Sequence, residues 1–381
     1  MPKSENALAG KGSGGRCRRG PKGTAFIAIA VVNLKEGQLN RRIITTSLAA
    51  LAAAAWIGGM TASASAFTAC QITDTGGVDD KGFNQTAWKG VQDAEKSLGV
   101  EGKLLESKAE TDYVPNINSF LGDKCDLIIT VGFLLGDATK AAAEANPDRK
   151  FSIVDFAYDP VVPNILGQVF ATDEAAFLAG YLAAGISKSG VVGTFGGINI
   201  PPVTIFMDGM ARGVAYYNKQ KGTKVTLLGW DPAKKEGLFT NNFDSLSDGR
   251  DFAKNLNDEG ADVVMPVAGP VGQGSAALAS ELGPDKLKII GVDVDQYDTD
   301  PEHKGVFLTS VLKRMDSTVI EAIKVAKDGT FKGGVTVGTL ANDGVGLAPY
   351  HDLDGAVPAE LKAEIDALKA DIIAGKVDVK M

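Results

Sequence analysis

Residues 68–85 read Thr68-Ala-Cys-Gln-Ile-Thr-Asp-Thr-Gly-Gly-Val-Asp-Asp-Lys-Gly-Phe-Asn-Gln85. The first six residues form a strand-like run that predicts a β-strand, and residues 85–98 have the pattern of a helix. Between them, Gly76 and Gly77 permit positive φ angles and let the backbone approach a ligand closely. The stretch therefore predicts a strand, a βα loop and a helix whose free N–H groups point at a cleft.

The same alternation of strand and helix continues along the chain. The strand-like runs are apolar almost throughout, which is typical of strands covered by helices on both faces. Regular β-α alternation predicts the α/β class with parallel sheets. We expect strands at 68–73, 127–131, 151–154, 191–195, 225–228, 263–267, 289–292 and 306–310, and helices at 85–98, 136–145, 174–186, 203–219 and 245–258.

The chain is long enough for two lobes, each a doubly wound, mainly parallel sheet. We expect one lobe from residues 67–171 with about 306–332, and the other from 172–305 with about 333–381. Open α/β sheets bind ligands beyond the carboxyl ends of their strands, so a ligand cleft is expected between the lobes.

Residues 1–66 have the features of an export signal that is removed. Arg41-Arg42 precedes an apolar run over 43–60, and Ala64-Ser65-Ala66 follows as a cleavage site. Nine of the 39 Lys/Arg and two of the 47 Asp/Glu fall in this segment, so residues 67–381 hold 30 basic and 45 acidic residues, a net charge of −15. Nucleic acid is not an expected partner, because phosphates recruit basic surfaces.

Two cysteines remain after residue 66, and two interpretations of them stay open. Phe67-Thr-Ala-Cys70 can be read as a lipobox whose Cys70 is acylated as a membrane anchor, although Phe67 is a poor substitute for the usual Leu. Alternatively, Cys70 and Cys125 form a disulfide in an oxidising envelope. We therefore expect an exported protein of the periplasm or cell envelope, with or without an anchor.

The loop 74–85 can be interpreted in two ways from its residues alone. Phe83 is an aromatic residue next to Asn84 in a polar loop, where it is poorly placed for core packing but well placed to stack on a planar ligand. The alternative is a solvated, charged loop with Phe83 packed beneath it. Loop chemistry does not separate these hypotheses.

A longer motif resembles a known family. Asp74-Thr-Gly-Gly-Val-Asp-Asp-Lys-x-Phe-Asn-Gln-x-Ala-Trp-x-Gly90 is similar to the signature of the basic membrane protein family, which includes purine nucleoside receptors, the substrate-binding components of ABC transporters. The chain departs from the motif at Gly82, where relatives commonly carry Ser. Weaker matches follow in the family's order: Val131-Gly-Phe133, Phe177-Leu-Ala-Gly-Tyr181, Phe195-Gly-Gly197, Gly260-Ala-Asp262, Val267-Ala-Gly269 and Gly291-Val-Asp293.

The resemblance implies a type I-like periplasmic-binding-protein fold that closes around a nucleoside, as a monomer that serves a membrane permease and its ATPase. It implies that Phe83 and Phe243 sandwich the base, with Phe239 as the alternative to Phe243. Asp74, Asn84 and Asp155 would then contact polar groups of the base, and Asp293 and Lys313 the ribose hydroxyls. Gly269 begins a glycine-rich turn that brings backbone N–H groups near the ligand or simply turns the chain.

Enzyme and cofactor sites lack their sequence signatures. His303 and His351 are the only histidines and lie far apart in sequence, and no Cys-x-x-Cys occurs, so we expect no metal site. The chain has no Gly-x-Ser-x-Gly elbow and no phosphate-binding Gly-Lys-Ser/Thr loop. We expect a binding protein without cofactors. Two alternatives remain: a receptor for a sugar or another small polar metabolite, and a nucleoside-processing hydrolase that uses Asp74, Asp79 and Asp80 around a bound cation.

Overall fold

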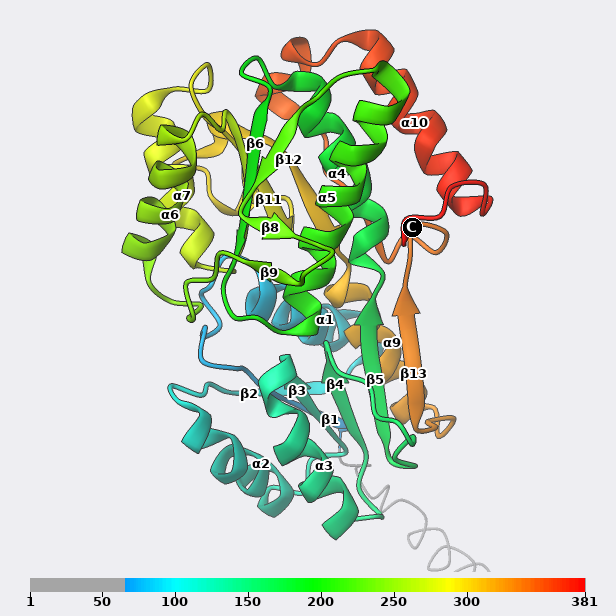
Figure 1. Ribbon diagram of the computed structural model, residues 1–381. Helices are drawn as coiled ribbons and strands as arrows, with labels where there is room; N and C mark the ends of the chain where they lie inside the picture. The colour runs from blue at the N-terminus through cyan, green and yellow to red at the C-terminus, as the bar shows by residue number, and fades with distance from the viewer. Residues whose placement is uncertain (1–65, 381) are drawn as a thin grey trace, which may run out of the picture. The chain divides into compact units, whose positions relative to one another are not determined.

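The computed structural model describes residues 66–380, and in this range two six-stranded sheets and a two-stranded ribbon are formed (Figure 1). The expected export signal lies, apart from Ala66, outside the described residues. No helix within residues 66–380 is both long enough and apolar enough to cross a membrane.

The first sheet has the strand order β13-β5-β4-β3-β1-β2, and all of its neighbouring strands are parallel. Strands β3 and β4 are buried along their whole length, which explains why their sequences are mainly apolar. Its strands are β1 (Thr68–Ile72), β2 (Glu101–Leu105), β3 (Leu127–Val131), β4 (Phe151–Val154), β5 (Ile165–Phe170) and β13 (Gly334–Gly338).

The second sheet has the order β14-β12-β11-β10-β6-β7, and only β14 runs antiparallel to its neighbour. The predicted α/β class with mainly parallel sheets is confirmed. The strands of this sheet are β6 (Val191–Gly196), β7 (Thr226–Leu228), β10 (Val263–Val267), β11 (Lys288–Asp293), β12 (Phe307–Lys313) and β14 (Val345–Leu347), and the separate ribbon is β8 (Trp230–Asp231) with β9 (Glu236–Gly237).

Helices cover both sheets, and the buried apolar residues of helices and strands form three clusters. One cluster lies between the first sheet and α2 with α3, a second between the second sheet and α6 with α7, and the largest includes α1, α4, α5, α9 and α10 (Figure 1). The helices are α1 (Phe83–Leu98), α2 (Tyr113–Gly122), α3 (Gly136–Ala145), α4 (Thr172–Ile186), α5 (Pro201–Lys221), α6 (Leu246–Asp258), α7 (Val271–Leu282), α8 (Gln296–Thr299), α9 (Met315–Lys327) and α10 (Ala359–Ile373).

The close pairing of α1 with α9 depends on one glycine. A Cβ atom at Gly90 would lie 2.7 Å from the backbone oxygen of Asp316 and 2.9 Å from the Cβ of Val319. Only a residue without a side chain lets the two helices approach this closely. Helix α9 therefore packs against α1, which follows β1 of the first sheet, although the strand before α9 belongs to the second sheet.

The expected lobe boundaries differ from the strand pairing after residue 305. Strand β12 was expected in the first lobe but pairs with β11 and β14, and β13 was expected in the second lobe but pairs with β5. The chain therefore passes between the sheets after β12 and again after β13. An apolar strand fits the interior of either sheet, so its local sequence does not specify its partner. Below, lobe 1 is the first sheet with α1, α2, α3 and α9, and lobe 2 is the remainder.

Candidate ligand-binding site

A cavity lies between the two lobes, beyond the carboxyl ends of strands from both sheets. It encloses about 610 Å³ of empty space, including open solvent at its mouth. Lobe 1 contributes the loop after β1, the turn after β3 and the end of β4, and lobe 2 contributes α5 and the ends of β10, β11 and β12. All eight residues that the sequence singled out line it: Asp74, Phe83, Asn84, Asp155, Phe243, Gly269, Asp293 and Lys313.

The loop from β1 to α1 is organised by Asp80. Its carboxylate accepts hydrogen bonds from the backbone N–H groups of Gly82 (2.9 Å), Asn84 (2.7 Å) and Gln85 (3.1 Å). Gly82 itself offers no capping side chain, so Asp80 satisfies the free N–H groups at the start of α1. Burial raises the pKa of Asp80 to about 7, although these backbone hydrogen bonds lower it.

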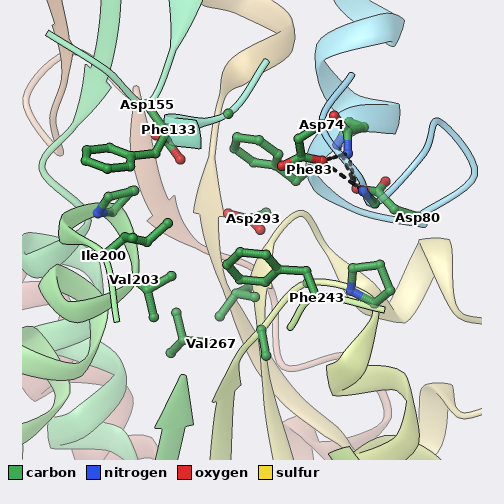
Figure 2. A pocket seen from close by; sticks show the side chains of 18 of the residues that line it. Asp74, Asp80, Phe83, Phe133, Asp155, Ile200, Val203, Phe243, Val267 and Asp293 are labelled. Atoms are coloured by element: carbon green, nitrogen blue, oxygen red, sulfur yellow. Dashed lines mark hydrogen bonds between the residues drawn. The ribbon is translucent and has the colours of Figure 1, made fainter. Parts of the chain in front are cut away.

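Asp74 and Asn84 form a polar pair that lines the cavity, and Figure 2 shows Asp74 beside Phe83. The Asn84 Nδ2 group donates to Asp74 Oδ1 at 2.7 Å, and the Gly76 N–H donates to the same oxygen at 3.0 Å. Burial raises the pKa of Asp74 despite these hydrogen bonds. Asn84 Oδ1 is buried and has no hydrogen-bond partner among the described residues. A buried acceptor without a donor is costly, so this position suits a ligand N–H or O–H group.

Lys313 is the centre of a second polar group. Its Nζ lies 2.7 Å from Asp155 Oδ2 and 3.5 Å from Asp293 Oδ1, and its side chain is 3% exposed. Burial alone would lower the pKa of Lys313, but the two carboxylates outweigh it and raise the pKa, so the ammonium stays charged. Two carboxylates against one ammonium leave a surplus of acceptors, which favours a ligand rich in hydrogen-bond donors.

Both of these aspartates occupy unusual backbone positions. Asp155 (φ 66°) follows β4 directly, and Asp293 (φ 71°) ends β11. Positive φ is uncommon for residues other than glycine and clusters at functional sites. The arrangement aims one carboxylate from each sheet at the same lysine.

Aromatic rings line the cavity from both lobes. Figure 2 shows the ring of Phe83, from lobe 1, above the ring of Phe243, from lobe 2, with Asp293 behind them. Phe243 packs against Gly197, where a Cβ atom would lie 2.3 Å from the ring. Phe239, the alternative to Phe243, instead packs edge-on against Trp230 with ring centroids 6.0 Å apart and does not line the cavity.

The sequence did not single out two further cavity aromatics as ligand contacts. Phe133 lies in the turn after β3 and Phe206 lies on α5, and both line the cavity. Phe133 belongs to the motif Val131-Gly-Phe133, and its place directly after a strand was a usable signal. Phe206 gave no such signal, because an apolar residue in a buried helix has the same pattern whether it faces a core or a cavity.

Among residues 66–380, no cysteine or histidine lines the cavity. Cys70 on β1 is fully buried and is bonded to Cys125, with the two Cα atoms 6.1 Å apart. A bonded cysteine has no free thiol for acylation, so this geometry favours the disulfide over the lipobox. His303 pairs with Asp300, and His351 pairs with Asp295. Within residues 66–380, no cluster of His, Cys, Asp and Glu has the arrangement of a metal site.

Comparisons with known proteins agree on one family. A model described as "Bmp: ABC transporter substrate-binding protein PnrA-like" matches residues 67–380. The chain is 32% identical to the ABC transporter nucleoside-binding protein BmpA of Lactococcus lactis, over 90% of this chain and 99% of that protein. It is 33% identical to basic membrane protein A of Borreliella burgdorferi, over 78% of this chain and 83% of that protein.

A solved structure has the same fold. The crystal structure of an ABC transporter solute-binding protein from Aeropyrum pernix K1 superimposes with a TM-score of 0.73 at 26% identity, over 82% of this chain and 92% of that chain. The architecture is that of type I periplasmic binding proteins, with a mainly parallel sheet in each lobe. The chain therefore belongs to the family of PnrA-like ABC transporter substrate-binding proteins, whose members bind solutes and are not enzymes.

Proposed function

We propose that this chain captures a purine nucleoside outside the cytoplasm and delivers it to an ABC importer. The main support is the combination of Phe83 and Phe243, one from each lobe, with buried polar groups in the same cavity. Stacking on an aromatic ring contributes about 1–3 kcal/mol per base. A flat base between the rings would contact both lobes and so stabilise their closure.

The polar groups suit the remaining parts of a nucleoside. Asp74 and Asn84 supply oxygen acceptors for N–H groups of a base, since Asn84 Oδ1 is unpartnered among the described residues. Asp293 and Asp155 supply acceptors for ribose hydroxyls, and Lys313 a donor. A neutral ligand avoids an unpaired buried charge, because Lys313 is already balanced by carboxylates.

The charges in the cavity are expected to discriminate between nucleosides and nucleoside monophosphates. A phosphate group would meet Asp74, Asp155 and Asp293, while the cavity's single lysine is already paired. Like charges in a buried site repel strongly. We therefore expect nucleosides to bind at least about a hundredfold more tightly than the corresponding monophosphates, equivalent to about 2.7 kcal/mol.

The family places the protein with a permease and an ATPase in the membrane, and we propose that it acts as an exported monomer. Export rests on the signal-like residues 1–66.

Titration calorimetry with guanosine, adenosine, inosine, ribose and guanosine monophosphate tests the proposed ligand. Tight binding of a purine nucleoside, weak binding of ribose and of the monophosphate, and recovery of intact nucleoside by chromatography support the proposal. Binding of ribose as tightly as guanosine would replace the nucleoside with a sugar. Release of free base would overturn the assignment as a receptor.

A further inference from the structure

The loop that carries Phe83 and Asn84 is also held from lobe 2 by contacts outside the cavity. The Gln273 side chain, on α7, donates from Nε2 to the backbone oxygen of Asp80 at 3.1 Å. The Lys81 ammonium donates to Asp300 Oδ1 at 3.2 Å. Neither Gln273 nor Asp300 lines the cavity. Two adjacent loop residues therefore contact two separate elements of the opposite lobe.

The Asp300 carboxylate is built into lobe 2 rather than lying free on its surface. Its side chain is 2% exposed, and His303 Nδ1 lies 2.8 Å from its second oxygen, Oδ2. Exposed ion pairs contribute little, but removing one partner of a buried charge leaves that charge uncompensated. The contact with Lys81 therefore differs in kind from an ordinary surface ion pair.

Hydrogen bonds within the loop connect Asp80, the neighbour of Lys81, to the start of α1. Lys81 has φ 55°, a conformation that is uncommon for a lysine, and its backbone is followed by the N-terminus of α1. Asp80 at the same time binds three N–H groups at that N-terminus. Holding residues 80 and 81 in place therefore also holds Phe83 and Asn84 at the cavity wall (Figure 2).

We propose that Gln273 and Asp300 form an inter-lobe latch: positioning residues that hold the ligand-contacting loop from the opposite lobe and slow the release of ligand. The latch joins the two lobes, so it forms only when they are together and must break before they separate. It is therefore expected to act on the dissociation rate and not on the association rate. The kinetic readout rests on the proposed nucleoside function.

Stopped-flow kinetics with guanosine test the latch in Lys81→Met and Gln273→Leu, each of which removes one donor and leaves the cavity lining unchanged. We expect the dissociation rate to rise about three- to tenfold in each variant, equivalent to about 0.7–1.4 kcal/mol. The rise should be larger in the double variant, with association rates within about twofold of the parent. Lys81→Arg should restore slow dissociation, since it keeps the charge.

The matched control is Lys103→Met. Lys103 and Asp123 form an ion pair of the same length, 3.2 Å, but both partners lie in lobe 1. The Lys103 side chain is 36% exposed, against 40% for Lys81. This variant should leave dissociation unchanged. If Lys81→Met and Gln273→Leu dissociate no faster than Lys103→Met, the latch does not exist.

Hydrogen exchange separates failure of the latch from failure of the nucleoside proposal. If no nucleoside binds the parent protein, the ligand proposal fails. The latch is then tested without ligand on the amides of Gly82, Asn84 and Gln85, because its contacts form whenever the lobes of the free protein come together. These amides should exchange faster in Lys81→Met and Gln273→Leu than in Lys103→Met. Equal exchange in all three variants would refute the latch.

Discussion

Replacing Lys313 by methionine would leave two carboxylates facing a buried, uncharged side chain. In the protein, Lys313 Nζ lies 2.7 Å from Asp155 and 3.5 Å from Asp293, and its side chain is 3% exposed. Removing one partner from a buried charge pair costs about 3–5 kcal/mol. We therefore expect Lys313→Met to lower the free energy of unfolding by about this amount at pH 8, as measured by urea titration.

The loss of unfolding free energy in Lys313→Met should increase as the pH rises. Burial already raises the pKa of Asp155 in the folded state, and removing Lys313 takes away the charge that opposes this rise, so its folded-state pKa lies further above that of an unfolded aspartate, near 3.9. The variant therefore takes up protons on folding and becomes less stable as the pH rises from about 4. The raised pKa of Lys313 keeps its stabilising charge in the parent across this range. The destabilisation should accordingly be smaller at pH 5 than at pH 8.

Lys288→Met is the matched control for this experiment. Lys288 is also a buried lysine, on β11, but its ammonium donates to the backbone oxygen of Pro284, and burial lowers its pKa. Replacing Lys288 leaves no directly contacting carboxylate without its partner. The electrostatic reasoning is refuted if Lys313→Met costs no more than Lys288→Met, or if its cost is the same at pH 5 and pH 8.

Three further predictions concern the loop and the disulfide. Phe83→Ala should weaken guanosine binding at least about tenfold in calorimetry, because one stacking face is lost. The control is Phe239→Ala, outside the cavity, which should reduce thermal stability and leave the affinity for guanosine near that of the parent. The pKa of Asp80 is raised from 3.8 to about 7 in the folded state, so this residue lowers stability as the pH rises through that window. Asp80→Asn should therefore flatten the decline in unfolding free energy between pH 4.5 and 7.5, and an unchanged slope would contradict this. Reduction of Cys70–Cys125, which are 55 residues apart, should cost about 4 kcal/mol in urea unfolding, and equal unfolding midpoints with and without reductant would contradict the pairing.

The fold class followed from local sequence because buried parallel strands have a distinctive composition. Runs such as 127–131 and 263–267 are apolar almost throughout and coincide with β3 and β10. The strands β2, β5, β13 and β14 were missed. β2 has one exposed and four half-buried residues, and β13 has three exposed residues and two glycines, so neither has the pattern of a central strand. β5 is an interior strand, but Gly167 and Gln168 interrupt its apolar run.

Local sequence could not predict to which lobe the segments after residue 305 belong. The sequence placed β12 with lobe 1 and β13 with lobe 2, and the strand pairing is the reverse. Strand partners are chosen by whichever sheet edge is free and by the packing of neighbouring helices, such as α9 against α1 through Gly90. That information lies in residues far apart in the chain.

What the sequence determined by itself was the chemistry available at strand ends: a polar, glycine-containing loop with Phe83 after the first strand, and aspartates after β4 and β11. The tertiary structure decided which of these groups meet. Only the folded chain brings Asp155 of one lobe and Asp293 of the other onto Lys313, directs Phe243 rather than Phe239 toward the cavity, and sets Gln273 and Asp300 against the loop 74–85. The reason is physical: residue type and spacing set local conformation, whereas distances between side chains on different lobes depend on how the two sheets and their helices pack together.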